Sequence, residues 1–332
     1  MRGAALVLLL LLPALSGCLG YEEHPIDIEP IRMNDVVLKG THNSYHLKPL
    51  GGEMIDRYNY SHLSLREQAD ELGVRVFELD VWYTPGLGLR VYHNLYDSAT
   101  TCAAFTDCLG ELHDWSEANP SHVPMWILIE PKDAVVIVEG VDILEMIEAD
   151  IASVWNDSAV LTPDKVRGES PTLREQITAG EGWPRLDDVR GMTAFALLEK
   201  GEVRDGYIAA KPGLENATMF TFSPIDAPEA ALASWVHPIE RGSELETAIE
   251  MGFMTRSRPD VDTVEAREGN YSRFDAIREL GVHMVSTDYP GNDVEVDFAI
   301  WFDHPVMCAP GAPPHCEAAE LEAWGNYSPP TN

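Results

Sequence analysis

Two histidines and four oxygen-bearing side chains stand in four short segments, each of which reads like the end of a β-strand. The segments are 36–43, 76–82, 89–94 and 126–132, and the side chains are His42, Asn43, Glu78, Asp80, His93 and Glu130. A pair of histidines supplies a proton acceptor and a proton donor near neutral pH. Amide and carboxylate oxygens are the ligands that calcium prefers. The set therefore predicts metal-assisted cleavage of a phosphodiester.

The second segment is the most informative of the four. Alternate side chains of a strand share a face, so Glu78 and Asp80 point one way and Phe77, Leu79 and Val81 the other. Two carboxylates on the axial face of a parallel barrel, near the carboxyl end of a strand, lie where barrel active sites are found. A divalent cation would offset their repulsion. The alternative is an exposed, half-polar strand, which the matching contexts of His42 and His93 disfavour.

Four further residues are candidates for substrate binding, each with a plain structural alternative. Lys132 follows Glu130 and would meet a phosphate oxygen, or is a surface lysine at a strand end. Arg256 and Arg258 follow an apolar segment and suit bidentate phosphate contact, or form salt bridges to acidic neighbours. Tyr289 would stack on a sugar-like ring, or pack in the core.

The order of these motifs resembles the calcium-dependent phosphatidylinositol-specific phospholipases C of bacteria. The residues that carry the resemblance are Gly40-Thr41-His42-Asn43-Ser44-Tyr45-His46, Glu78-Leu79-Asp80, Tyr92-His93, Ile129-Glu130 and Val285-Ser286-Thr287-Asp288-Tyr289-Pro290. The resemblance runs from about residue 34 to 290. It implies that His42 and His93 are catalytic and that calcium is bound by Asn43, Glu78, Asp80 and Glu130. It also implies attack of the inositol 2-hydroxyl on phosphorus. We assign His42 as base or charge stabiliser near the phosphate and His93 as the acid that protonates the diacylglycerol oxygen, and a ligating carboxylate such as Glu78 or Glu130 would be able to share the base role.

Apolar strands alternate with amphipathic helices along the chain, which predicts βα units around a parallel sheet. Ser64-Leu65-Arg66-Glu67 predicts a capping box that opens a helix ending near Gly73. Expected strands cover residues 74–81, 89–93, 124–130, 192–198, 217–222, 253–255 and 282–287, and expected helices cover 103–119, 142–154, 172–179, 243–251 and 272–280. We expect a single-domain α/β fold, a (β/α)8 TIM-like barrel, regular or irregular.

The ends of the chain predict export and a lipid anchor. Residues 1–17 read as a signal peptide, because Arg2 precedes an apolar run too short to span a bilayer. Leu15-Ser16-Gly17-Cys18 resembles a bacterial lipobox, so Cys18 is expected to carry lipid. An ordinary signal peptide with an incidental cysteine is the alternative. Residues 18–33 would form a tether, 34–290 the barrel, and 291–332 an irregular tail packed on the barrel.

The other four cysteines fall into two local pairs, Cys102 with Cys108 and Cys308 with Cys316. In an oxidising compartment these predict two short-loop disulfides. A zinc site is the alternative, but both spacings are wider than the usual zinc-ligand spacing.

The chain has 332 residues, 45% of them hydrophobic, and a formal net charge of -32. This length suits one barrel domain. The acidic charge excludes nonspecific nucleic-acid binding and opposes adsorption to anionic membranes. A surface so acidic also occurs in proteins adapted to salt.

Three functions are therefore compared. The first is a lipid-anchored phosphodiesterase at the cell envelope that cleaves phosphatidylinositol-type lipids. The second is a glycerophosphodiester phosphodiesterase, which Glu130-Pro131-Lys132 permits and the Thr41-His42-Asn43 segment disfavours. The third, a non-catalytic surface lipoprotein, is disfavoured because both histidines and all four oxygen ligands are present.

Overall fold

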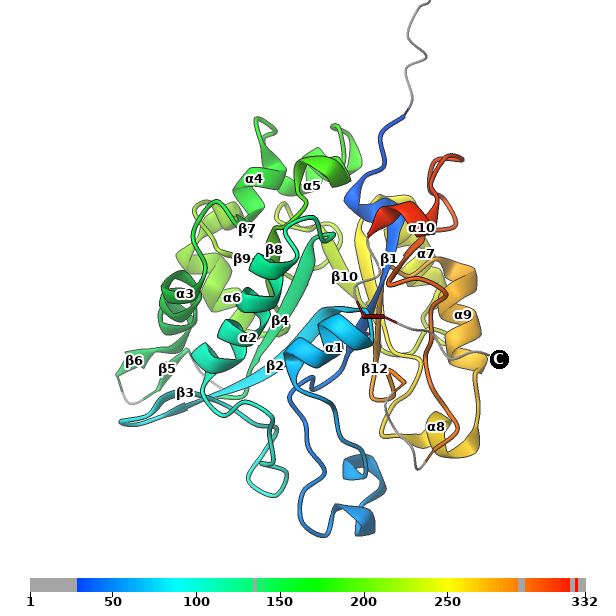
Figure 1. The fold of residues 1–332 in the computed structure, drawn as a ribbon. Helices are drawn as coiled ribbons and strands as arrows, with labels where there is room; N and C mark the ends of the chain where they lie inside the picture. The colour runs from blue at the N-terminus through cyan, green and yellow to red at the C-terminus, as the bar shows by residue number, and fades with distance from the viewer. Residues whose placement is uncertain (1–28, 134–135, 139, 292–295, 323–325, 328–332) are drawn as a thin grey trace, which may run out of the picture.

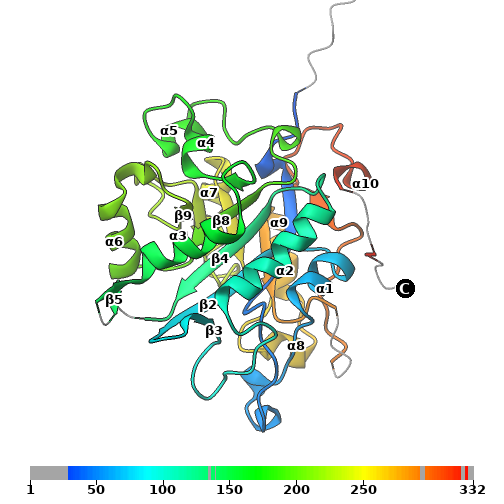
Figure 2. The same ribbon diagram turned by 60° about the vertical axis from the view of Figure 1, so that its left-hand side comes forward.

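A computed structural model describes residues 29–133, 136–138, 140–291, 296–322 and 326–327. The expected signal peptide, Cys18 and most of the tether lie outside this range. Eight parallel strands form the centre of the fold, and helices cover their outer face (Figures 1 and 2). In spatial order these strands are β9 (Met219–Thr221), β8 (Thr193–Leu197), β4 (Met125–Pro131), β2 (Val74–Thr84), β1 (Val36–Thr41), β12 (Met284–Thr287), β11 (Met254–Ser257) and β10 (Leu232–Ser234).

The sheet curls into a barrel that is not fully closed. Within the described part of the chain no strand pairing joins β9 to β10, so these two strands are the ends of the curled sheet. The architecture confirms the expected TIM-like barrel and shows that it is irregular. No helix among the described residues has the length and apolarity needed to cross a bilayer.

Ten helices surround or extend the barrel strands. They are α1 (Leu65–Glu71), α2 (Phe105–Ala118), α3 (Ile143–Val154), α4 (Pro163–Arg167), α5 (Leu173–Thr178), α6 (Glu202–Ala210), α7 (Gly242–Glu250), α8 (Val264–Glu268), α9 (Ser272–Leu280) and α10 (Ala318–Leu321) among the described residues. The first begins as predicted, because Ser64 and Glu67 form a reciprocal capping box. Helix α6 and strand β10 were not anticipated, since both are short and weakly patterned.

Residues 88–93 differ from the other three site segments. Strand β3 (Gly88–Val91) pairs antiparallel with the far end of β2, with Thr84 opposite Gly88, and is not a barrel strand. A turn this short cannot make the crossover that a parallel strand needs. The strand expected at residues 89–93 is thus present, but it is not a barrel strand, so His93 is placed differently from His42 and Glu130. His93 follows a hairpin formed by the carboxyl-terminal end of β2 and by β3.

Smaller strands attach to the main sheet or lie apart from it. Strand β7 (Val160–Leu161) pairs with β8, and β5 (Ile137–Val138) with β6 (Val141–Asp142) forms a separate hairpin. The C-terminal segment adds β13 (Val306–Cys308), which pairs antiparallel with β1. Through this strand the C-terminal segment is joined to the barrel sheet.

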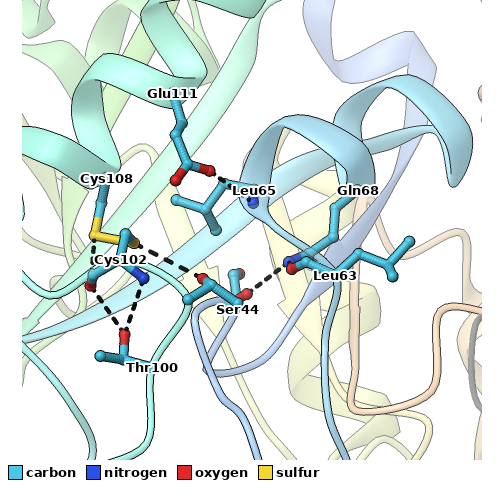
Figure 3. The surroundings of a disulfide bond; sticks show 9 residues. Ser44, Leu63, Leu65, Gln68, Thr100, Cys102, Cys108 and Glu111 are labelled. Atoms are coloured by element: carbon cyan, nitrogen blue, oxygen red, sulfur yellow. Dashed lines mark hydrogen bonds between the residues drawn. A yellow bond between two sulfur atoms is a disulfide. The ribbon is translucent and has the colours of Figure 1, made fainter.

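Both expected disulfides are present, Cys102 with Cys108 and Cys308 with Cys316. The first lies where the loop after β3 enters α2 (Figure 3). There Thr100 Oγ1 donates a hydrogen bond to the carbonyl of Cys102 at 2.9 Å. On the neighbouring α1, Gln68 donates to the carbonyl of Ser44 at 2.6 Å (Figure 3). Thr101 N donates to the Tyr45 carbonyl at 2.8 Å, so the loops after β1 and β3 are held side by side.

Candidate active site

A cleft of about 360 Å³ opens at the carboxyl ends of the barrel strands. Its lining residues come from loops or strand ends of β1, β2, β4, β8, β9, β10 and β11: His42, Glu78, Glu130, Leu198, Glu199, Lys200, Phe222, Ser234, Val236, Arg256 and Arg258. This is the end of a parallel barrel at which active sites are built. The cleft brings together candidates that lie more than two hundred residues apart in sequence.

Three carboxylates gather on the axial side of two neighbouring strands. Strands β2 and β4 are paired so that Asp80 lies opposite Glu130, and Glu78 is two residues back on the same face. One oxygen from each of the three side chains lies within 4.8 Å of the others. The period-2 argument from the sequence is therefore consistent with the observed cluster.

Cationic side chains approach this cluster from two sides. Lys132 Nζ lies 2.6 Å from Glu130 Oε1 and 2.9 Å from Asp80 Oδ2. Arg256 forms a buried ion pair with Glu78. Burial by itself raises the pKa of Glu78, but Arg256 and His42 outweigh burial and hold that pKa below its usual range.

Asp80 is the member of the cluster that is least satisfied. It is wholly buried, and burial together with Glu130 raises its pKa well above the ordinary value. Its Oδ2 forms an ion pair with Lys132, and neither Asp80 oxygen accepts a well-oriented hydrogen bond. A buried carboxylate between two others is a donor set that fits a divalent cation with oxygen ligands.

Asn43 reaches the same region through an unusual backbone conformation. Its φ angle is 44°, in the left-handed region that asparagine tolerates better than most residues. The next residue fixes it in place, because Ser44 N donates to the Glu78 carbonyl at 2.9 Å and Ser44 Oγ accepts from Glu78 N at 2.8 Å. Asn43 is buried, and the bonds of Ser44 join its segment to β2 at Glu78. An amide oxygen is a type of ligand that suits the same cation.

His42 is held by a carboxylate that follows the adjacent strand. Its Nδ1 lies 2.7 Å from Asp288 Oδ1, and its Nε2 lies 3.7 Å from Glu78 Oε1. Arg258 bonds the other Asp288 oxygen at 2.7 Å. Although burial raises the pKa of Asp288, Arg258 and His42 lower it far below its usual range. Asp288 is therefore an anion that orients the His42 ring with Nε2 toward the cleft.

His93 has a different partner, supplied by its own loop. Its Nδ1 lies 2.9 Å from Asp97 Oδ2, and Asp97 Oδ1 lies 2.8 Å from His46 Nε2. The His93 side chain is 30% exposed, whereas those of Asp97 and His46 are each 1% exposed. Tyr92 N donates to the Asp80 carbonyl at 3.3 Å, which ties the start of this loop to the carboxylate cluster.

The remaining candidates separate into two groups. Arg256 and Arg258 are buried and line the cleft, where they pair with acids of the site itself. Tyr289 is 1% exposed and packs near Tyr60 and Phe298, which matches the core-packing alternative.

Sequence reasoning assigned no role to several residues of the site. The carboxylate partners Asp97 and Asp288 had visible signals, because one lies four residues after His93 and the other inside the quoted closing motif. Lys200, which faces the cleft from the end of β8, had none.

A family model described as "Phosphoinositide phospholipase C, Ca2+-dependent" matches residues 84–310, a range that includes His93 and Glu130 and begins after His42 and Asp80. A search of curated protein sequences finds no match.

Solved structures with the same fold include bacterial phospholipases C. A calcium-dependent phosphoinositol-specific enzyme from Pseudomonas sp. is 16% identical, with a TM-score of 0.58, over 79% of this chain and 93% of that one. A calcium-dependent phosphatidylinositol-specific enzyme from Streptomyces antibioticus is 20% identical, with a TM-score of 0.60, over 84% and 99%. The family match spans more than half of this chain, and calcium is the cofactor of that family. The chain therefore belongs to the calcium-dependent phosphoinositide phospholipases C.

Proposed function

We propose that this phospholipase cleaves phosphatidylinositol or a close relative by intramolecular transfer. The inositol 2-oxygen forms a bond to phosphorus, and the bond from phosphorus to the diacylglycerol oxygen breaks. The products are diacylglycerol and a cyclic inositol phosphate. Two protons move in this step: one leaves the 2-hydroxyl and one arrives on the departing oxygen, so the site needs a base and an acid.

His42 is proposed as the base. Asp288 accepts a hydrogen bond from the Nδ1–H group of His42, which leaves Nε2 free of hydrogen and turned toward the cleft. The carboxylate also stabilises the imidazolium that forms when Nε2 takes the 2-hydroxyl proton. Arg258, bonded to the far side of Asp288, keeps this carboxylate from turning away.

His93 is proposed as the acid that protonates the diacylglycerol oxygen. It lies outside the residues that line the cleft, on the exposed hairpin side of the site. A lipid leaving group needs an exit toward the surface, whereas the inositol ring needs the enclosed cleft. The placement of the two histidines is consistent with this division.

Asn43, Glu78, Asp80 and Glu130 are the residues proposed to hold calcium. When bound, calcium polarises the phosphate and lowers the pKa of the attacking hydroxyl. Lys132 and Arg256 lie against the same carboxylates and are proposed to offset the charge of the diester.

The surface around the cleft favours a lipid substrate over a soluble diester. Every exposed large apolar side chain that the structure describes lies in a segment that follows a barrel strand, at the cleft end of the molecule: Leu50, Met54, Ile55, Leu87, Leu95, Tyr96, Ile137, Ile239, Val264 and Tyr271. We call this set the apolar rim. Exposed apolar side chains concentrated at one end of a molecule mark an interaction surface, and an acidic protein needs such contacts to meet a lipid surface.

The observation that carries the proposal is the cleft itself, where His42, held by Asp288, lies beside the cluster of Glu78, Asp80 and Glu130. The test is product analysis with phosphatidylinositol vesicles and with glycerophosphoinositol, each with and without a calcium chelator. We expect diacylglycerol and cyclic inositol phosphate from the lipid, little turnover of the deacylated diester, and none with chelator. Faster turnover of glycerophosphoinositol would instead support the glycerophosphodiesterase alternative.

Export and anchoring form a separate proposal. The two disulfides indicate an oxidising compartment. We propose that Cys18, which lies outside the described residues, carries lipid and holds the enzyme at the cell envelope. Intact-mass analysis of the exported protein tests this, since an unmodified chain cleaved elsewhere would contradict it.

A further inference from the structure

Asp97 is placed between two histidines, one on each of its oxygens. Oδ2 lies 2.9 Å from His93 Nδ1, and Oδ1 lies 2.8 Å from His46 Nε2. Burial raises the pKa of Asp97, but the hydrogen bonds from His46 and His93 outweigh it and lower that pKa. The bridge is therefore an anion between two imidazoles.

The loop after β3 is built to hold this carboxylate still. Asp97 forms paired backbone hydrogen bonds with Asn94, and Asn94 Oδ1 accepts from Asp97 N at 3.1 Å. The loop after β1 pairs with the same segment, since His46 and Thr100 form an antiparallel bridge. The His46 ring stacks on Tyr60, with ring centroids 4.2 Å apart. Two independent loops thus fix Asp97 relative to His93.

The hydrogen bonds also determine which ring nitrogen carries each proton. His46 Nδ1 is buried and has no hydrogen-bond partner, whereas Nε2 lies 2.8 Å from Asp97 Oδ1, so Nε2 is the nitrogen that carries the donated proton. His46 accordingly donates to Asp97 through Nε2.

His93 Nδ1 has two neighbours that favour opposite tautomers. The Asn94 amide nitrogen lies 3.0 Å away and would donate to an unprotonated Nδ1, whereas the Asp97 carboxylate requires Nδ1 to donate. The charge-assisted bond is the stronger of the two, so Nδ1 carries hydrogen. The remaining nitrogen, Nε2, is then the one available to the leaving oxygen.

We propose that Asp97 and His46 are positioning residues for the acid His93: Asp97 fixes its tautomer and aim, and His46 fixes Asp97. This inference rests on the proposed function, in which His93 protonates the diacylglycerol oxygen. The alternative is that the His46–Asp97 pair only holds two loops together. The two roles predict different kinetics. Positioning the acid affects only a reaction whose leaving group needs a proton, whereas holding two loops together affects the reaction of either substrate.

The test compares kcat on phosphatidylinositol with kcat on an inositol phosphodiester whose leaving group is a nitrophenol. We expect Asp97→Asn to lower kcat on the lipid on the order of tenfold or more and to affect the nitrophenyl ester far less, because a nitrophenolate leaves without a proton. His93→Ala should show the same pattern, and the double variant should be little worse than His93→Ala alone. Glu111→Gln is the matched control, since Glu111 accepts a hydrogen bond from Leu65 N and joins α1 to α2 (Figure 3), and it forms no bond to His93, Asp97 or His46 among the described residues.

A second pair of variants addresses the case in which Asp97→Asn does not fold. His46→Gln retains an amide donor for Asp97 and should keep most of the lipid activity, whereas His46→Leu removes the donor and should show the leaving-group pattern. Equal losses on both substrates for Asp97→Asn or His46→Leu would overturn the positioning role and indicate a structural one. Loss of lipid activity in His93→Ala but not in Asp97→Asn would contradict the positioning role and leave His93 as the proposed acid. An unchanged rate for His93→Ala would contradict the proposal that His93 is the acid.

Discussion

The two histidines of the site occupy contrasting settings. His42 follows barrel strand β1, and its partner Asp288 follows the adjacent strand β12, where Thr41 lies opposite Thr287. His93 follows an antiparallel hairpin outside the barrel, and its partner Asp97 is four residues further along the same loop. The pair at His42 is thus fixed by the parallel sheet, while the pair at His93 is fixed by contacts between loops.

The contrast shows that the parallel sheet by itself places one histidine beside its carboxylate, whereas the other pair needs contacts between loops. Neighbouring parallel strands bring their carboxyl ends to one edge, so any barrel can place a carboxylate beside a histidine in this way. A histidine on a projecting loop needs its own supports, and here these include His46, Asn94 and the Cys102–Cys108 disulfide. The predictions below test whether the two halves of the site respond differently.

Removal of calcium should have the largest effect. The proposed ligands lie on the barrel side, where Asp80 is buried and neither of its oxygens accepts a well-oriented hydrogen bond. We expect a chelator to abolish turnover and added calcium to restore it, and Asp80→Asn to weaken calcium binding in a calorimetric titration while the far-UV circular dichroism spectrum is retained. Full turnover in excess chelator would be incompatible with this site.

The histidine variants should come next. His42→Ala and His93→Ala should each lower kcat on phosphatidylinositol by about a hundredfold or more, the usual contribution of a positioned base or acid. Only the loss at His93 should shrink when the leaving group is a nitrophenol, because the base acts on the inositol hydroxyl in both substrates. Matching losses on the two substrates for both variants would remove the distinction between them.

The disulfides should have an intermediate effect. Each closes a short loop, so replacing either pair with serine should cost about 2–3 kcal/mol of unfolding free energy in the chain-entropy model. Cys102 and Cys108 lie where the loop that carries His93 enters α2, whereas Cys308 and Cys316 lie by β13. Urea unfolding should show comparable losses for the two pairs, and kinetics at low temperature should show reduced kcat for the first pair only. Equal kinetics would mean that the disulfide does not support the His93 loop.

The smallest effect concerns two buried histidines that are not catalytic. Burial lowers the pKa of His62 and of His283 to about 4, from an ordinary value of 6.5. His62 Nε2 lies 3.0 Å from the His42 carbonyl, and His283 Nδ1 accepts from Thr255 N at 3.1 Å. Between about pH 6.5 and 4 these histidines bind protons in the unfolded chain but not in the folded protein. The free energy of unfolding therefore falls as pH is lowered through this window.

Unfolding free energies measured from pH 7 to 5 test this effect. The slope contributed by each histidine approaches about 1.4 kcal/mol per pH unit. His62→Gln and His283→Gln should each make the dependence shallower. Only His62→Gln should also reduce activity, because His62 supports the backbone of His42 and His283 lies at the start of β12. An unchanged slope in both variants would show that other groups set the acid sensitivity.

The fold and the acid cluster were largely readable from the sequence for local reasons. Strand and helix periodicity predicted the βα order, and the Ser64–Glu67 capping box was observed where it was expected. Because strand side chains alternate, the shared face of Glu78 and Asp80 followed from their spacing alone. The two disulfides followed from the proximity of each cysteine pair in the sequence. These features depend on residues close together in the chain.

The tertiary structure alone decided the features that depend on distant pairing. No local pattern shows that Asp288 meets His42, that Arg256 neutralises Glu78, or that β9 and β10 leave the barrel open, because each depends on strand order around the barrel. The placement of His93 after a hairpin and the hydrogen bond between His46 and Asp97 depend on how two loops meet. Sequence determined which chemical groups are present and on which strand faces they lie, and the three-dimensional packing determined their partners, since hydrogen bonds and ion pairs act over distances in space and not along the chain.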